Sequence, residues 1–217
     1  MITVLGRRNS MNVQKVMWTL GELNLPYRRE DVGGSFGYPP GYPNPMQVVP
    51  TIRDGDLVVW ESNACVRHLA RTYGTGTLWP DDVARQAQAD MWTEWQRSDI
   101  SNAFFPLFTG LIRGFATTPE KLERGAKESG RLFGQLDTWL QGRMFITGDT
   151  LSIADICIGA MMYRYMTMPI ERPTLANLAS WYHRLTERPA YRRHVMVEYG
   201  RNPGEWAQRE QENAGIQ

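Results

Sequence analysis

An acid and a hydroxyl group side by side, Glu61 and Ser62, are the residues best suited to bind a charged ligand. They follow a predicted strand over Leu57–Trp60 and begin a predicted helix. A helix N-terminus has free N–H groups and partial positive charge, so it binds anions. Ser62 can donate a hydrogen bond to a carboxylate there, while Glu61 can pair with an ammonium group. The pair suits an amino-acid-like end of a ligand, although an ordinary helix cap would use the same residues.

Pro50 lies eleven positions before Glu61, with a predicted β-hairpin between them. The hairpin signal is Asp54-Gly55-Asp56, because Asp-Gly is a strong short-range turn signal between two apolar runs. An X-Pro bond can be cis at modest cost, and a cis Pro50 would turn the backbone N–H and C=O of Val49 toward a ligand. An extended peptide could then pair with Val49 like an added strand. An ordinary turn proline is the alternative, but the joint spacing favours a binding site.

A polar cluster, Asn9-Ser10-Met11-Asn12, follows the first predicted strand and precedes a helical apolar pattern. Hydrogen-bond donors there, together with the positive end of the helix, can stabilise an anion. Ser10 and Asn12 are our candidate donors. If Ser10 only caps the helix, Asn9 or Asn12 would donate instead.

Arg113 ends a nearly apolar helical stretch over residues 104–112. An arginine there could stabilise an anion inside a pocket. The alternative is a side chain that reaches from a helix end to solvent just before Gly114. Arg7 and Arg8, after the first strand, could bind a carboxylate or simply be solvated.

The elements that must position these residues alternate between strand and helix up to about residue 79. We expect strands over 3–5, 27–32, 50–53 and 57–60, and helices over 13–23 and 62–73, with an aperiodic loop over 33–45. The order is therefore β-α-β-loop-β-β-α.

Strand signals end at Leu78-Trp79-Pro80, and the periodicity is helical from there on. We therefore expect two domains, residues 1–79 and residues 86–217, the second all-helical. Pro106 should kink or break its first long helix. Thr118-Pro119 and the Ser152/Asp155 capping box mark two helix starts. The polar tail from about Asn202 should be loosely ordered.

Composition favours a small-molecule partner. Lys+Arg 24 against Asp+Glu 23 gives no global charge that would recruit nucleic acid or an anionic membrane. Cys65 and Cys157 lie far apart, without metal-ligand spacing, so we expect neither a disulfide framework nor a metal site. No apolar segment is long enough to cross a membrane. We expect a cytoplasmic protein in a reducing compartment.

Together these motifs resemble the soluble, cytosolic-type bacterial glutathione transferase family over almost the whole chain. The segments that carry the resemblance are Asn44–Pro50 as N-P-x-x-x-V-P, Glu61–Ala64 as E-S-x-A, Leu78-Trp79-Pro80, the Ser152/Asp155 box and Thr186–Ala190. The resemblance implies a thioredoxin-like first domain, with glutathione as co-substrate and no metal. Val49 and Pro50 would hold the cysteinyl unit, and Glu61 and Ser62 the γ-glutamyl unit.

The chemistry implied is activation of the glutathione thiol, whose ordinary pKa is about 8.5. Donors in the first turn could lower that pKa by about one to two units. Ser10 occupies the position that resembles the serine-type classes, in an atypical Asn-Ser-Met-Asn turn; Asn12 is a second polar group, and Arg113 could stabilise the thiolate or a charged substrate. No cysteine lies in this turn, which disfavours disulfide exchange.

The resemblance implies a homodimeric enzyme whose helical domain shapes a pocket for a small hydrophobic electrophile, attacked by conjugation or dehalogenation. We expect Met11, Phe104, Phe108 and Tyr163 among the lining residues. Two alternatives remain open: a non-catalytic binding or interaction protein of the same fold, and a glutathione-dependent peroxidase or isomerase.

Overall fold

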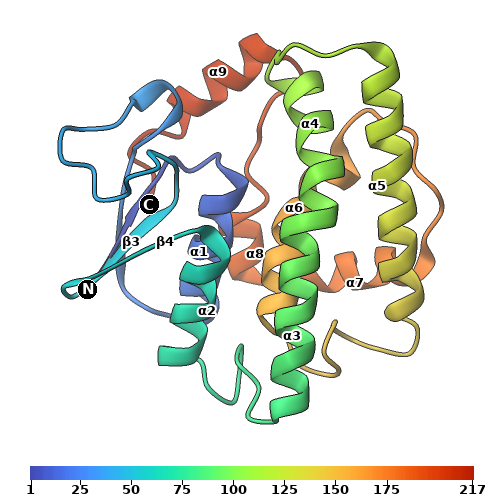
Figure 1. Ribbon diagram of the computed structural model, residues 1–217, viewed down its shortest axis with the longest axis horizontal. Helices are drawn as coiled ribbons and strands as arrows, with labels where there is room; N and C mark the ends of the chain where they lie inside the picture. Colours follow the sequence, from blue (N-terminus) through green and yellow to red (C-terminus); the bar gives the residue numbers. More distant parts are fainter.

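The first part of the chain forms a four-stranded sheet with two helices packed on it. The structure is a computed structural model that describes residues 1–217. Figure 1 shows the sheet at the left of the molecule and the helical part at the right. The strands are β1 (Ile2–Leu5), β2 (Tyr27–Glu30), β3 (Thr51–Asp54) and β4 (Leu57–Trp60), and the helices are α1 (Met11–Glu22) and α2 (Ser62–Tyr73). The expected order of elements is confirmed.

The sheet has the strand order β2-β1-β3-β4. Strands β1 and β2 are parallel, because α1 crosses over between them, and β3 runs antiparallel to β1. Strands β3 and β4 form the predicted hairpin, in which Thr51 pairs with Trp60 and Asp54 with Leu57. Gly55 closes the turn at φ +60°, a backbone conformation that glycine adopts without steric cost. The hairpin sets Pro50 beside the start of α2.

Helices make up the rest of the chain. They are α3 (Val83–Trp95), a π-helical segment η2 (Gln96–Ile100), α4 (Ser101–Ile112), α5 (Pro119–Trp139), α6 (Ile153–Thr167), α7 (Ala176–Thr186), α8 (Pro189–His194) and α9 (Pro203–Glu212). The predicted break at Pro106 does not occur, because α4 continues through the proline. The hydrogen-bond pattern of the long helix changes instead at η2, between α3 and α4. There the backbone amide of Ser101 bonds to the carbonyl of Gln96, five residues earlier.

Two helix starts follow the predicted capping chemistry. Thr118 caps α5 by accepting a hydrogen bond from the Lys121 amide, with Pro119 at the first helical position. Ser152 and Asp155 form the expected capping box of α6. Asp155 also accepts a bond of 2.9 Å from the indole N–H of Trp181, so the box ties α6 to α7 inside the core.

The sheet part and the helical part share one continuous apolar core. Trp18 of α1 is fully buried, and its ring packs edge-on against Tyr191 of α8 at 4.7 Å between centroids. Gly159 of α6 allows this approach, because an added Cβ would lie 2.9 Å from the Trp18 ring. The Tyr191 hydroxyl donates to the Gly159 carbonyl at 2.9 Å. These contacts hold α1 firmly against the helices.

The prediction of a loosely ordered tail is wrong. Residues 203–212 form α9, which runs above the sheet part in Figure 1, and the chain ends beside β2. The guanidinium of Arg29 donates to the carbonyl of Ile216, and the Gln217 side chain accepts from the Arg29 amide at 2.7 Å. Such hydrogen bonds satisfy the polar groups of this tail. Apolar periodicity does not reveal them, because it detects only apolar faces.

Candidate functional site

Two adjoining pockets lie where α1 and the loop before β3 face α4, α6 and α9. We call the first, of about 310 Å³, the polar pocket, and the second, of about 210 Å³, the arginine pocket. Both are lined by Met11, Asn12, Val48, Val49 and Phe105. The seven residues singled out in the sequence all line one pocket or both: Ser10, Asn12, Val49, Pro50, Glu61, Ser62 and Arg113.

The polar pocket begins at the loop before β3. The peptide bond between Val49 and Pro50 is cis, the isomer that the pairing of Val49 with a ligand requires. No other backbone group bonds to the amide or the carbonyl of Val49, so both are free to pair with a ligand. The preceding carbonyl, of Val48, is held by Tyr42 and Asn44, which donate to it at 2.9 and 3.0 Å.

Glu61 and Ser62 lie at the N-terminus of α2. Glu61 occupies the N-cap position at φ +67°, a strained conformation for a residue with a side chain, and its carboxylate makes no capping bond. That carboxylate is half exposed and lies 3.9 Å from the guanidinium of Arg97. Ser62 is buried, with its hydroxyl 3.4 Å from the ammonium of Lys15. The two side chains therefore do not act as the ordinary helix cap that was the alternative.

Ser10 occupies the N-cap position of α1, but its hydroxyl makes no capping hydrogen bond. The hydroxyl is therefore available to a ligand in the arginine pocket. Asn9, beside it, is 1% exposed, and neither atom of its side-chain amide has a hydrogen-bond partner. Buried polar groups normally have partners, so this amide suits a ligand in the same pocket. Asn12 is exposed and borders both pockets.

Three arginines converge on the arginine pocket: Arg7, Arg113 and Arg164. Arg164 is buried on α6, donates to the carbonyl of Asn9 and lies 4.6 Å over the Phe108 ring. Burial lowers the pKa of Arg164 to about 9. No carboxylate pairs with it within 4.0 Å.

Arg113 ends α4, half-buried, and its Nε–H has no hydrogen-bond partner. Its guanidinium lies 5.2 Å from the centre of the Trp206 ring of α9. Burial, and next the charge of Arg7, lower the pKa of Arg113. Glu210 is the carboxylate that reaches this cluster, with its Oε2 2.8 Å from the Nε of Arg7 in an ion pair that is not aligned as a hydrogen bond. The cluster thus has an excess of positive charge.

Comparison with known proteins assigns the chain to a family. Residues 9–72 match the family model of the glutathione S-transferase N-terminal domain, and residues 100–189 match that of the C-terminal domain. The chain belongs to the glutathione S-transferase family. Glutathione S-transferase GstB of Escherichia coli strain K12 is 41% identical over 208 residues, which is 91% of this chain and 99% of that protein.

Solved transferase structures agree with the fold. A theta class glutathione S-transferase from Xanthomonas axonopodis pv. citri, with glutathione bound, is 40% identical with a TM-score of 0.86, over 91% of this chain and 98% of that one. Its apo form is 37% identical with a TM-score of 0.80, over 91% and 97%. A Bombyx mori glutathione transferase, BmGSTD1, is 25% identical with a TM-score of 0.78 and covers 95% of each chain.

Lys15 and Arg164 of this transferase were not predicted from the sequence, and Asn9 was only an alternative donor. A signal existed for Arg164, the one basic residue in the largely apolar α6. Lys15 lies on the buried face of α1 between Val13 and Val16, where a polar residue is unexpected. Of the expected lining residues, Met11 and Phe108 line the arginine pocket, whereas Phe104 is fully buried and Tyr163 lines a different pocket.

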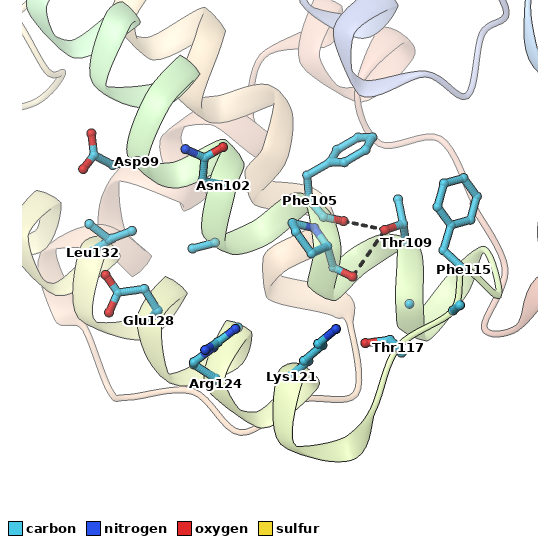
Figure 2. Close-up of a pocket in the computed structure, with 15 residues that line it drawn as sticks. Asp99, Asn102, Phe105, Thr109, Phe115, Thr117, Lys121, Arg124, Glu128 and Leu132 are labelled. Carbon is cyan, nitrogen blue, oxygen red and sulfur yellow. Dashed lines mark hydrogen bonds between the residues drawn. The ribbon is translucent and has the colours of Figure 1, made fainter.

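The transferase has a larger groove, of about 710 Å³, between α4 and α5. Figure 2 shows Lys121, Arg124 and Glu128 along the α5 side of this groove, and Thr109 on α4. The Thr109 hydroxyl donates to the carbonyl of Phe105 at 2.9 Å, which is a bond within α4. None of the seven predicted residues lines this groove, although it shares Asn102 and Phe105 with the polar pocket.

Proposed function

We propose that this glutathione S-transferase ionises the thiol of glutathione where the two pockets meet and directs the thiolate onto an electrophilic carbon. In that reaction the thiol proton leaves to solvent, the sulfur forms a bond to carbon, and the leaving group departs with the electron pair of its own bond. The observation that carries the proposal is the Ser10 hydroxyl, which is free of capping bonds at the positive end of α1. A donor there stabilises the sulfur anion.

Glutathione lies along the polar pocket in this proposal. Its cysteinyl unit pairs with the free amide and carbonyl of Val49, next to Pro50. Its γ-glutamyl carboxylate lies at the N-terminus of α2 and accepts from Ser62, while Glu61 pairs with the α-ammonium group. The sulfur then points toward Ser10, with Asn12 at the border of the two pockets.

The second substrate occupies the arginine pocket, and we infer that it carries a negative charge on an aromatic frame. Three arginines line this pocket, and Glu210 is the one carboxylate that pairs with any of them. The net positive charge of the pocket therefore attracts an anion. The walls include Phe108 and Trp206, which suit a planar ring. Arg113 has an unpartnered Nε–H and is the side chain best placed to meet a carboxylate of the electrophile.

A matched pair of electrophiles tests this function. We expect glutathione-dependent release of chloride from 4-chloro-3-nitrobenzoate and from 4-chloro-3-nitrobenzamide, with a kcat/KM at least tenfold higher for the benzoate, because only the benzoate carries the charge. Equal kcat/KM values for the two compounds would overturn the inference that the second substrate is an anion. Tight binding of glutathione with no turnover of any electrophile would favour a non-catalytic binding protein instead.

A homodimer is part of this proposal. Two apolar side chains on one face of β4, those of Val58 and Trp60, are exposed, as is Tyr73 of α2. Such an exposed apolar surface is typical of a protein interface. Sedimentation should show a dimer that Trp60→Glu converts to monomer; a monomeric wild-type protein would contradict it.

The division into residues 1–79 for glutathione and residues 86–217 for the electrophile is proposed on the same basis. Ser10, Val49, Pro50, Glu61 and Ser62 come from the first segment, while the helical segment supplies Arg113, Arg164 and the aromatic walls Phe105, Phe108 and Trp206 of the second pocket. A cytoplasmic, reducing location is supported by Cys65 and Cys157, both buried free thiols. No helix of the structure is long and apolar enough to cross a membrane.

A further inference from the structure

Lys15 of α1 is a buried cation without a carboxylate partner. The residue is 1% exposed, and its ammonium nitrogen lies 2.9 Å from the side-chain oxygens of both Asn63 and Gln96 and 3.4 Å from the hydroxyl of Ser62. All three neighbours are neutral. A buried lysine is normally paired with an acid, because burial of an uncompensated charge is costly. The protein therefore holds a positive charge that nothing in its own interior balances.

The charged groups around Lys15 do not supply this balance. Burial is the main cause that lowers the pKa of the Lys15 ammonium to about 8, and Arg97 lowers it further. Glu61 acts in the opposite direction, but its carboxylate is half exposed and lies near Arg97. Burial raises the pKa of the Cys157 thiol, so this thiol is neutral at physiological pH. A buried charged group that has a perturbed pKa, lacks a counter-ion and lines a pocket is typical of a binding site.

Lys15 and Ser62 line the same end of the polar pocket, at the N-terminus of α2. Asn63 is fixed there by its own bonds, since its amide nitrogen donates to the Thr93 carbonyl at 3.1 Å and to Gln96 at 3.2 Å. The ammonium is therefore held in position by α2 and η2 before any ligand binds. Its contact with Ser62 is the longest of the three, and hence the one most easily exchanged for a ligand oxygen.

We propose that Lys15 is the buried counter-ion of the γ-glutamyl α-carboxylate, and that it selects ligands that carry this group. The inference rests on the proposed binding of glutathione in the polar pocket. The carboxylate completes the ion pair that the folded chain leaves open, so that Ser62, the α2 N-terminus and Lys15 all act on one anion. As a consequence, the bound ligand raises the pKa of Lys15, and binding above about pH 8 takes up a proton.

A cycle of two proteins and two ligands tests the ion pair. The ligands are S-methylglutathione, which has no ionisable thiol, and its analogue with 4-aminobutyrate in place of the γ-glutamyl unit, which lacks the α-carboxylate. Lys15→Met should weaken binding of S-methylglutathione about ten- to hundredfold at pH 7, and binding of the analogue by less than about twofold. Lys127→Met, at an exposed position on α5, is the control and should change neither.

The pattern across the cycle decides the proposal. Equal loss for both ligands would mean that Lys15 only maintains the structure, and no loss for either would mean that it does not meet the carboxylate; each result overturns the ion pair. Failure of the wild-type protein to bind S-methylglutathione would instead overturn the proposed function, since the polar pocket would not be the glutathione site.

A second measurement needs no variant that might fold poorly. The chain has only two other lysines, Lys121 and Lys127, both exposed, so nitrogen NMR of labelled lysine side chains resolves each ammonium. In the free protein Lys15 should titrate near 8, and saturation with S-methylglutathione should raise its midpoint by at least one pH unit. The other two midpoints should stay constant. An unchanged Lys15 midpoint in the saturated protein would overturn the proposal.

Discussion

The polar pocket and the arginine pocket share a wall but are built in different ways. In the polar pocket the groups proposed to pair with glutathione at Val49, Pro50, Glu61 and Ser62 come from one short stretch of sequence, folded as a hairpin between two motifs, whereas Lys15 comes from α1. The arginine pocket takes its three cations from the turn after β1, the end of α4 and the last turn of α6. The motifs that bind the constant ligand are thus encoded locally, while the cations that face the variable ligand depend on how distant segments converge.

The two pockets also differ in how they hold positive charge. In the polar pocket one buried ammonium is fixed by neutral oxygens of Asn63 and Gln96. In the arginine pocket the guanidinium of Arg164 is packed on the ring of Phe108, and Glu210 offsets the charge of Arg7. Delocalised guanidinium groups tolerate such aromatic packing, whereas a compact ammonium needs hydrogen-bond acceptors. We therefore expect variants of the two pockets to affect different substrates.

Ser10→Ala should have the largest effect, and it should act on every electrophile alike because Ser10 serves the sulfur. Loss of the donor lets the thiol pKa return toward its ordinary value, so turnover near neutral pH should fall at least tenfold and up to about a hundredfold, with glutathione affinity largely retained. Initial rates with the benzoate and the benzamide measure this.

The control for this variant is Ser180→Ala, at an exposed position on α7, which should have normal rates. If Ser10→Ala is unaffected while Asn9→Ala or Asn12→Ala loses activity, the thiolate donor is an asparagine and Ser10 contributes only its backbone to the start of α1.

Arg113→Met should come next and should separate the two electrophiles. We expect kcat/KM for the benzoate to fall about ten- to thirtyfold, through loss of a charged hydrogen bond, while the benzamide changes less than about twofold. Arg124→Met, in the groove of Figure 2, should leave both values unchanged. A similar fall for both electrophiles would assign Arg113 to the thiolate instead of the second substrate.

Ser62→Ala tests the polar pocket by itself. Removal of one hydrogen bond to the γ-glutamyl carboxylate should raise the KM for glutathione about five- to tenfold, with the same factor for either electrophile and with kcat nearly constant. A factor that depended on the electrophile would show that the two pockets are not separable in the way proposed here.

Glu210→Gln should have the smallest effect, in the favourable direction. The variant keeps a side chain that can contact the Arg7 guanidinium and the backbone amide of Ser35, but removes the negative charge that now lies 2.8 Å from each of them. The KM for the benzoate should therefore fall about two- to fivefold, and that for the benzamide should not change. A higher KM for the benzoate would mean that Glu210 positions Arg7 for the substrate.

The difference between groups positioned by sequence neighbours and groups positioned by distant segments explains how much could be predicted from the sequence. The hairpin around Gly55 and the start of α2 at Ser62 depend on neighbouring residues, and both were predicted correctly; the cis bond before Pro50 is the isomer that the binding-site interpretation required. Arg113 was found only because an arginine after an apolar stretch is unusual. Arg164 and Lys15 were missed, because burial of a cation depends on partners more than forty residues away, Ser62 in the case of Lys15.

The tail was misjudged for a related reason. Its polar groups pair with the first part of the chain: the carboxylate of Glu210 with Arg7, the side chain of Asn213 with Arg8 and the backbone carbonyl of Ile216 with Arg29. Periodicity detects apolar faces and is blind to pairs of this kind. As a result, Trp206 of α9, a wall of the arginine pocket, could not be assigned to the site from the sequence.

An ultraviolet titration of the thiolate of glutathione, bound to the wild-type protein and to Ser10→Ala, shows most directly whether Ser10 stabilises the sulfur anion. We expect a midpoint about one to two pH units below the ordinary thiol pKa of about 8.5 in the wild type, and a return toward 8.5 in the variant. A wild-type midpoint equal to that of free glutathione, with the ligand shown to be bound, would contradict it.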